Sequence, residues 1–395
     1  MDKIHFPKKE LVLLATHSGA SLANIIDKHL VRIRREQWNE EFKNFPERKK
    51  LEFLKQSYLV GAQNPHFGTG ELKSVIDESV NEAQIFIIAD IVNPTEYNMR
   101  GTPNRSSAID NFYQALSMAN AADSLNTEIH LVMPYFFSGR QDKIKERESL
   151  DLELACNMVK AAGISSVVTL DAHSPDVLRG ALGKKRFNDL HSSYHHIRLF
   201  LEIRKQLEGN DFSLDDWEIT GPDAGANDRS DFYSRQLKGK PSIHGMDKLR
   251  DFKEITDGYN NLISHEYHGP PFTTNILMID DIIGSGRTSI SAASIAKTNG
   301  AKKVDLMASH GLFLKGADCI IKAHEEGIID QVYITDACYV PPEVLRLPYV
   351  HVANSLDLFG HYINRMNRGK SRSELLDNKD KIQDLLMTMG MKYQP

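Results

Sequence analysis

Short apolar runs alternate with longer amphipathic segments along most of the 395-residue chain. Runs of five to ten residues rich in Val, Ile and Leu are typical of buried strands, whereas apolar residues three and four apart are typical of helices. Strands are therefore predicted at 84–92, 127–136, 165–173, 217–223, 275–281, 302–311 and 329–337. Helices are predicted at 106–126, 149–163, 229–237 and 288–300. This βαβ rhythm predicts an α/β protein whose parallel sheets carry helices on both faces.

The rhythm occurs twice, which indicates two domains of similar architecture. Periodicity is lost at 180–195, so we predict domains at 1–185 and 186–395. Two polar segments interrupt the pattern of the first domain. Residues 31–58 are predicted to be a helical, solvated insertion, and residues 94–108 a surface loop because they contain Gly101 and Pro103.

Composition narrows the class of protein. With 41% hydrophobic residues the chain can bury sizeable cores. Its net charge of −5 argues against sequence-independent binding of nucleic acid, which needs a basic surface. Cys156, Cys319 and Cys338 are odd in number and widely spaced, which suits a reducing compartment and neither a disulfide framework nor a paired metal site. The first residues are too charged for a signal peptide or membrane span, so we expect a cytoplasmic enzyme that binds no membrane.

The stretch NILMIDDIIGSGRT, 275–288, contains a predicted strand followed by residues that could bind a ligand. Asp280 and Asp281 are expected where the strand ends, at the edge of the sheet where α/β proteins bind ligands. Adjacent carboxylates can accept hydrogen bonds from vicinal sugar hydroxyls or hold hydrated Mg²⁺. The small residues that follow precede a helix N-terminus, which favours a phosphate. The segment is equally compatible with an ordinary turn in which Asp281 is solvated.

Seven further segments carry motifs that occur in a fixed order along the chain. They are FGTGE (67–71), PYFFSGRQDK (134–143), TLDAHSPD (169–176), TGPDAG (220–225), GMDKLRD (245–251), ASHGLF (308–313) and NRGKSRSELL (367–376). On these motifs the chain from about 60 to 376 resembles the PRPP synthases, or ribose-phosphate diphosphokinases, a branch of the type I phosphoribosyltransferase fold. The resemblance implies two tandem phosphoribosyltransferase-like domains, each a largely parallel sheet with helices on both faces.

The resemblance also implies a reaction. In this family the anomeric hydroxyl of ribose 5-phosphate attacks the β-phosphorus of ATP, so that diphosphate is transferred as a unit and AMP leaves. Phosphoryl transfer depends mostly on positioning and on stabilisation of negative charge. A chain that performs it needs ligands for Mg²⁺, cationic side chains near the phosphates and a binding site for the sugar.

The family holds Mg²⁺ with a histidine and an aspartate that match His173 and Asp223. Each follows a predicted strand, although a lone histidine at such a place is more often structural. The denser cluster at His191, His195 and His196 has no acidic partner at ligand spacing, so it is interpreted as surface.

The family's cationic and nucleotide-binding segments are also present. Lys248 and Arg250 match residues of a mobile catalytic loop, where a lysine charge and an arginine fork suit a dispersed negative charge. Phe67 and Glu71 match positions that contact adenine from a neighbouring subunit, although Phe67 is equally compatible with a core position. Thr69 stands where the family has an aspartate that binds the adenine amino group, which weakens the prediction of strict ATP specificity. The segment expected to hold the nucleotide is Arg140, Gln141 and Asp142.

The ribose-phosphate loop departs from the family at two positions. Gly284 replaces a third aspartate and Arg287 replaces a glycine. A guanidinium beside a phosphate site favours additional negative charge, so the acceptor is either ribose 5-phosphate or a larger ribosyl phosphate such as ADP-ribose. An Arg287 that points to solvent is the simpler alternative. The residues predicted to bind the ribosyl phosphate are Asp280, Asp281, Gly284, Ser285, Gly286, Arg287 and Thr288.

Three function classes follow. The first is a Mg²⁺-dependent diphosphokinase that uses ATP, the second a phosphoribosyltransferase that consumes PRPP, and the third a non-catalytic regulatory homologue. The transferase is disfavoured because it needs one such domain and no segment like SGRQDK. Retention of Lys248 and Arg250 favours the active diphosphokinase over the regulatory homologue. The resemblance also implies a homo-oligomer that shares its nucleotide site between subunits.

Overall fold

The computed structural model describes residues 6–99, 102–124, 126–144, 146–243, 245–256 and 259–391. They form two compact units. The first unit contains the chain up to residue 191 together with 337–339 and 355–377, and the second contains 192–336, 340–354 and the chain from 378 onward. The chain therefore passes from the first unit to the second after residue 191. Residues 337–339 and 355–377 belong to the first unit again, which the two domains predicted from sequence did not include.

A five-stranded, wholly parallel sheet in the order β1-β4-β7-β8-β9 forms the centre of the first unit. Leu13, Ile87 and Leu131 on its three adjacent strands are fully buried, because helices cover both faces. The strands are β1 Leu11–Ala15, β4 Gln84–Ile88, β7 Glu128–Val132, β8 Ser166–Leu170 and β9 Phe187–Leu190.

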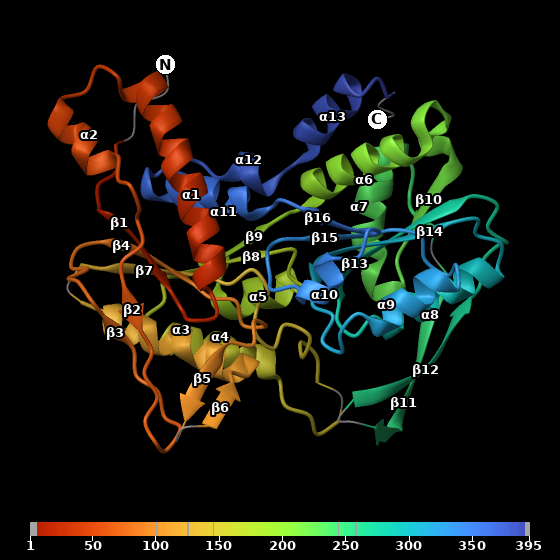
Figure 1. The fold of residues 1–395 in the computed structure, drawn as a ribbon, viewed down its shortest axis with the longest axis horizontal. Helices are drawn as coiled ribbons and strands as arrows, with labels where there is room; N and C mark the ends of the chain where they lie inside the picture. The colour runs from red at the N-terminus through yellow and green to blue at the C-terminus, as the bar shows by residue number, and fades with distance from the viewer. Residues whose placement is uncertain are drawn as a thin grey trace. The chain divides into compact units, whose positions relative to one another are not determined.

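Two groups of helices cover this sheet, one on each face (Figure 1). Helices α1 and α11 pack closely against one another, where a Cβ at Gly360 would lie 3.1 Å from the Cβ of His29. The first group is α1 Ala20–Gln37, α11 Leu356–Asn367 and α12 Ser373–Leu376. The second group is α3 Ala108–Ala122, α4 Asp151–Ala161 and α5 Pro175–Leu182.

The insertion at 31–58 has an aromatic core of its own. It contains the end of α1, a π-helical turn at Trp38–Phe42 and helix α2 at Glu47–Phe53. The helical prediction is confirmed, but the prediction of a solvated segment is wrong, because Trp38, Phe42 and Phe53 are buried against one another. The buried guanidinium of Arg34 lies 4.7 Å from the centroid of the Phe53 ring, which adds a cation–π contact.

Two short hairpins lie on the first unit. Strands β2 Ala62–Gln63 and β3 Val75–Ile76 pair before β4, and strands β5 Glu96–Met99 and β6 Thr102–Arg105 pair within the segment 94–108. The prediction of an irregular loop over 94–108 is therefore wrong at the level of the backbone. The sequence of this segment has no alternation of apolar and polar residues, which is the usual signal for a strand, so the pairing was not predicted.

The second unit repeats the architecture. Its parallel sheet has the order β10-β13-β14-β15-β16. Trp217 and Tyr333 are buried beneath the helices of one face. The strands are β10 Trp217–Thr220, β13 Asn275–Ile283, β14 Val304–Gly311, β15 Val332–Thr335 and β16 Val350–Ala353.

The helices of the second unit again form two layers. The first layer is α6 Ser193–Glu208, α7 Asn227–Lys238 and α13 Lys379–Thr388. The second is α8 Arg287–Thr298 and α9 Asp318–Glu325, with the short α10 Pro342–Leu345 beside the edge strand β16. An antiparallel hairpin, β11 Met246–Thr256 and β12 Tyr259–Tyr267, projects from the body of this unit (Figure 1).

The α/β prediction, with two tandem domains and largely parallel sheets, is confirmed. Every strand and helix predicted from the hydrophobic pattern is present, with ends shifted by a few residues. None of the helices in the described part of the chain combines the length and apolar content needed to span a bilayer.

Candidate functional site

The paired carboxylates lie within a strand and not after it. Strand β13 runs to Ile283, two residues past Asp281, because Ile282 and Ile283 continue the pairing with β14. The expectation that the strand ends on the acids is therefore wrong. Asp280 is half-buried and Asp281 is buried, and the backbone N–H of Asp281 donates to Asp280 Oδ1 over 2.9 Å.

A third carboxylate lies near this pair. Asp223 follows β10, the parallel neighbour of β13, and its Oδ1 accepts a hydrogen bond of 2.9 Å from the backbone N–H of Gly225. Burial raises the pKa of Asp280 well above its usual range, and the negative charges of Asp281 and Asp223 raise it further. A bound cation would oppose all three effects, so the donor set fits a Mg²⁺ ion or sugar hydroxyls.

The loop after β13 forms a compact turn that leads into α8. Gly286 has φ +80°, a conformation that favours glycine, and a Cβ at this position would lie 2.8 Å from the Sγ of Cys319. The thiol of Cys319 also donates to the carbonyl oxygen of Ser285 over 3.1 Å. The carbonyl of Gly284 accepts from the backbone N–H of Leu314, the residue directly after the matched ASHGLF segment, over 2.9 Å. The loop is therefore held by its carbonyl oxygens.

The first turn of α8 is suited to an anion. It has no acidic residue, and no side chain caps it. The backbone N–H groups of Arg287, Thr288 and Ser289 have no helical acceptor at this end, and the helix dipole adds positive potential. Arg287 is exposed and Thr288 half-buried. The loop and the start of the helix together can accept a phosphate, as predicted from the small residues.

Lys248 and Arg250 lie on strand β11 of the hairpin, within the same unit as the carboxylates. Lys248 pairs with His265 and Arg250 with Leu262, with a register shift between Leu249 and Arg250. The side chains of both basic residues lie outside the described part of the structure. The backbone nevertheless shows that this segment forms a paired strand.

In the first unit, a buried carboxylate fixes the loop that carries His173. Asp189, on β9, accepts hydrogen bonds from the Thr169 hydroxyl (2.7 Å) and from the backbone N–H of Ala172 (3.0 Å). Asp171 adopts φ +46°, which turns the chain sharply between these two contacts. His173 is exposed at the end of this turn, beyond the carboxyl end of β8. Burial raises the pKa of Asp189.

The predicted nucleotide segment touches the same loop. The hydroxyl of Ser174 donates to Asp142 Oδ2, which joins the segment after β7 to the residue after His173. Arg140 is exposed, and the side-chain amide of Gln141 donates to the carbonyl oxygen of Ser149 over 3.1 Å. The motifs PYFFSGRQDK and TLDAHSPD therefore meet at one edge of the sheet, through residues 32 apart in sequence.

Phe67 and Glu71 lie on a tight turn. The backbone N–H of Phe67 donates to the carbonyl of Glu71 over 2.7 Å, and the hydroxyl of Thr69 donates to Glu71 Oε2 over 2.8 Å. The Phe67 ring is 50% exposed, so the alternative of a core position is wrong. The turn presents an aromatic ring, a hydroxyl and a carboxylate to the surroundings.

The histidine cluster is not a surface feature. His195 and His196 are buried, and His196 Nδ1 lies 3.1 Å from both the Ser192 and Tyr233 hydroxyls. His191 is partly exposed and does have an acidic partner, because its Nδ1 lies 3.1 Å from Asp171 Oδ1. The surface interpretation was wrong because it considered sequence spacing alone, whereas helix α6 turns His195 and His196 toward the sheet.

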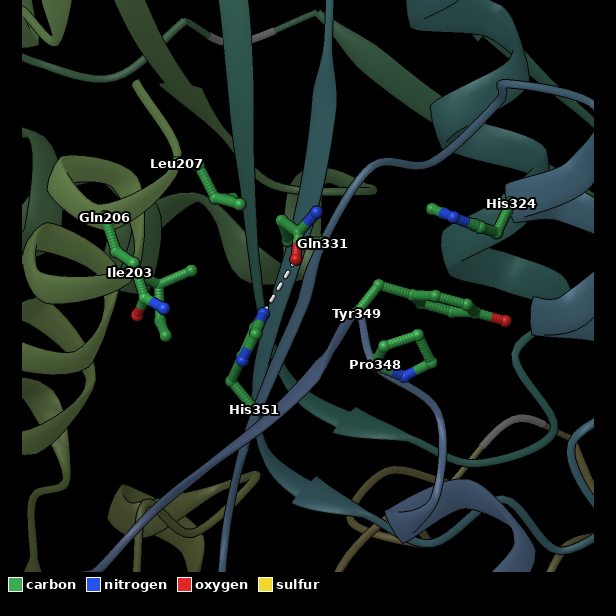
Figure 2. Close-up of a pocket in the computed structure, with 8 residues that line it drawn as sticks. All are labelled: Ile203, Gln206, Leu207, His324, Gln331, Pro348, Tyr349 and His351. Atoms are coloured by element: carbon green, nitrogen blue, oxygen red, sulfur yellow. Dashed lines mark hydrogen bonds between the residues drawn. The ribbon is translucent and has the colours of Figure 1, made fainter. Parts of the chain in front are cut away.

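A pocket of about 300 Å³ in the second unit is lined by none of these groups (Figure 2). It is at the amino ends of β15 and β16, where His351 Nε2 lies 2.7 Å from Gln331 Oε1 and the His324 ring stacks on Tyr349. No lysine, arginine or carboxylate lines it, so it is poorly suited to a phosphorylated ligand. Its lining residues are Ile203, Gln206, Leu207, His324, Gln331, Pro348, Tyr349 and His351.

Thus the second unit brings Asp223, Asp280 and Asp281 together beside the loop 284–288, and the first brings His173 close to Asp142 through Ser174. Among the described residues, no group of three or more His, Cys, Asp or Glu side chains forms a ready metal cage. Asp189, Ser174 and Cys319, which support the two loops, were missed because nothing in their local sequence marks a long-range contact.

Comparison with known proteins gives the family. Residues 11–163 match the N-terminal domain of ribose phosphate pyrophosphokinase, and residues 273–377 match the phosphoribosyl synthetase-associated domain. A phosphoribosylpyrophosphate synthetase from Mycobacterium smegmatis superimposes with a TM-score of 0.66 over 91% of this chain and 100% of that chain. At 18% identity this match supports the fold alone.

Two sequence relatives support the same conclusion. A ribose-phosphate pyrophosphokinase of Mycoplasmopsis pulmonis is 27% identical over 276 residues, which cover 69% of this chain and 74% of the relative. A protein of Streptococcus agalactiae serotype V, named as a second ribose-phosphate pyrophosphokinase, is 30% identical over 275 residues, with the same coverage of 69% and 74%. The chain therefore belongs to the ribose-phosphate pyrophosphokinase family of enzymes.

Proposed function

We propose that this protein transfers the β,γ-diphosphate of ATP to the anomeric hydroxyl of ribose 5-phosphate, giving PRPP and AMP. The hydroxyl oxygen forms a bond to the β-phosphorus, the bond from this phosphorus to the oxygen bridging to the α-phosphorus breaks, and the hydroxyl proton is released. The observation that carries the proposal is the group of three carboxylates, Asp223, Asp280 and Asp281, beside a glycine turn and an uncapped helix N-terminus.

The sugar phosphate is assigned to the second unit. Asp280 and Asp281 would accept hydrogen bonds from the 2- and 3-hydroxyls, directly or through Mg²⁺. The loop from Gly284 to Gly286, with Arg287 and Thr288, would receive the 5-phosphate. The hydrogen bonds that engage the loop's carbonyl oxygens support this role, because they leave backbone N–H groups available to an anion.

ATP is assigned to the segment Arg140–Asp142 and to the turn carrying Phe67 and Glu71. The exposure of Phe67 supports the expectation that its ring stacks on an adenine bound to a neighbouring subunit, in a homo-oligomer with shared nucleotide sites. Thr69 can donate or accept a hydrogen bond, whereas the aspartate of the family only accepts one. The adenine preference is therefore expected to be less strict than in relatives with the aspartate.

Mg²⁺ is the expected cofactor. It usually binds proteins through one or two carboxylates and completes its shell with water and substrate phosphates, so a cage of three protein ligands is not needed. His173 and Asp223 are the proposed protein ligands, with Asp280 and Asp281 as further oxygen donors on the sugar side. The ion would supply charge neutralisation on the transferred phosphates.

Lys248 and Arg250 are proposed to stabilise the transferring diphosphate. Their place on a hairpin of the unit that holds the carboxylates supports this role. A non-catalytic regulatory homologue has no need of two cations there, and a phosphoribosyltransferase that consumes PRPP has no need of an ATP segment. Both alternatives have less support than the diphosphokinase, and the reaction products distinguish the three functions.

Arg287 supports a second candidate acceptor. It lies at the first position of α8, where no acidic residue of the first turn neutralises it, and its exposure equally fits the alternative in which it points to solvent. A guanidinium there favours an acceptor with more negative charge than one phosphate, and ADP-ribose has a diphosphate and a free anomeric hydroxyl. The same chemistry on ADP-ribose is the alternative function, linked to NAD metabolism instead of nucleotide biosynthesis.

One experiment separates these proposals. The protein is incubated with ATP and Mg²⁺ and with either ribose 5-phosphate or ADP-ribose, and mass spectrometry detects AMP and the diphosphorylated sugar. PRPP formed from ribose 5-phosphate supports the main proposal, and reaction of ADP-ribose alone supports the alternative. Base-dependent release of diphosphate from PRPP without AMP would indicate a transferase, and binding without turnover would indicate a regulatory protein.

A further inference from the structure

A partly buried hydrogen bond joins the β11–β12 hairpin to helix α8. His265, on β12, is 2% exposed, and its Nδ1 lies 2.9 Å from the hydroxyl oxygen of Ser291 on α8. Loss of either partner of a buried hydrogen bond leaves the other to bear its desolvation cost, so such a bond resists relative movement of the two elements. The hairpin and the helix are therefore coupled at this point.

Both ends of this bond lie next to groups of the proposed reaction. His265 is the cross-strand partner of Lys248 in the hairpin register. Ser291 is four residues after Arg287, so it lies one helical turn beyond the N-terminus of α8, where the proposed ribose-phosphate site ends. The loop 284–288 is thus connected to the strand that carries Lys248 by helix α8 and by the hydrogen bond between Ser291 and His265.

The base of the hairpin is fixed separately by apolar packing. Met246 and Phe272 are buried in the same core as Ala292 and Ala296 of α8, and the ring of Tyr267 stacks on Phe272 with centroids 4.5 Å apart. Apolar contacts are not directional, so they permit small rotations. The hydrogen bond adds a directional constraint at His265, two residues before Tyr267 on β12.

We propose that His265 and Ser291 are positioning residues that set the hairpin bearing Lys248 and Arg250 over the ribose-phosphate loop. This inference rests on the proposed diphosphoryl transfer. Transfer of phosphoryl groups depends on alignment, and a misplacement of about 1 Å can reduce the rate by roughly 100-fold. Neither residue belongs to the proposed substrate-binding groups, so removal of the pair is expected to change the turnover rate more than the affinity.

The test uses the full-length chain with His265→Ala, Ser291→Ala and the double variant. Ser294→Ala, on the same helix, is the matched control, and His265→Asn can restore a polar group near the position of Nδ1. Each single alanine variant is expected to lower kcat for AMP formation by roughly tenfold, with KM changed by less than about threefold, and the double variant is expected to be no worse than either single. Asparagine is expected to recover most of the loss.

An unchanged kcat in both single variants, or losses that multiply in the double variant, would overturn the inference. If His265→Ala does not fold, Ser291→Ala alone decides between these outcomes. Hydrogen exchange of the backbone amides of 246–267 gives a readout that is independent of activity: faster exchange is expected in both alanine variants but not in Ser294→Ala. If the unaltered protein makes no AMP, the proposed function fails, whereas an active protein with unaffected variants refutes only this inference.

Discussion

The thiol of Cys319 donates a hydrogen bond to the carbonyl oxygen of Ser285 over 3.1 Å, from helix α9 to the loop that follows β13. The same sulfur would lie 2.8 Å from a Cβ at Gly286. The loop proposed to bind the ribose phosphate is thus packed against a side chain 34 residues away in sequence. The loop's shape consequently depends on α9 as well as on its own small residues.

Gly286→Ala is expected to disturb this loop. Alanine at φ +80° is strained, and its methyl group would displace Cys319, so we expect a loss of about 1–3 kcal/mol in unfolding free energy and a KM for the sugar phosphate raised by about tenfold or more. Gly327→Ala is the matched control, because Gly327 has φ +68° but open space around its Cβ position. Initial rates against acceptor concentration and urea unfolding measure the two effects. Equal behaviour of the two variants would contradict the packing argument.

Asp189→Asn is expected to loosen the loop that carries His173. Asp189 accepts from Thr169 and Ala172, and an amide replaces one acceptor oxygen with a donor. We expect the KM for MgATP to rise by roughly tenfold, with a stability loss of about 1–3 kcal/mol. Asp211→Asn, at an exposed position, serves as the control and is expected to behave like the unaltered protein. An unchanged KM for MgATP in Asp189→Asn would show that the loop does not depend on this carboxylate.

Arg204→Met is expected to destabilise the second unit strongly. The buried guanidinium donates through Nε to Asp305 Oδ2 over 2.9 Å and through a terminal nitrogen to Asp330 over 2.7 Å, and it lies 4.5 Å from the Trp217 ring centroid. Its removal leaves the buried Asp305 without a cation, a loss of about 3–5 kcal/mol. Arg179→Met removes a surface pair with Asp176 and a longer cation–π contact, 5.8 Å from the Phe187 ring centroid, and we expect a loss of about 1 kcal/mol. Denaturant unfolding compares them, and similar losses would refute this explanation.

The stability of the first unit is expected to depend on pH through Asp90. Burial raises the pKa of this carboxyl from 3.8 to about 7, although the backbone N–H groups of Tyr339 and Val92 donate to it. The folded state therefore holds a proton that the unfolded state releases, and stability is lost as pH rises from about 4 through 7, by at most about 4 kcal/mol.

Asp90→Asn removes this titration. Unfolding free energies measured from pH 4 to pH 8 should fall more steeply for the unaltered protein than for the variant. Because the amide also changes the hydrogen bonds, the difference in slope and not the difference in stability is the relevant quantity. Parallel curves would show that Asp90 does not titrate in this range.

The hydrophobic pattern was sufficient to predict the sheets, because a strand that is buried on both faces has a continuous apolar sequence, such as QIFII in β4. It could not predict features fixed by distant partners. Trp38 and Phe53 belong to a segment predicted to be polar and solvated, yet their rings pack on one another. His196 was predicted to lie on the surface, yet it contacts the hydroxyl of Tyr233. In the candidate site, the sequence motifs predicted the carboxylates and the glycine turn. Asp189 and Ser291 could not be predicted, because their contacts are with residues distant in sequence.

The central claim is that diphosphate moves as one unit from ATP to a ribosyl phosphate. Phosphorus-31 NMR of a reaction containing ATP, Mg²⁺ and ribose 5-phosphate tests it most directly. The account predicts AMP and a new pair of coupled resonances from a diphosphate on the sugar, both dependent on the sugar and both lost in Lys248→Ala. Formation of ADP, or of AMP with free diphosphate in the absence of any acceptor, would contradict it.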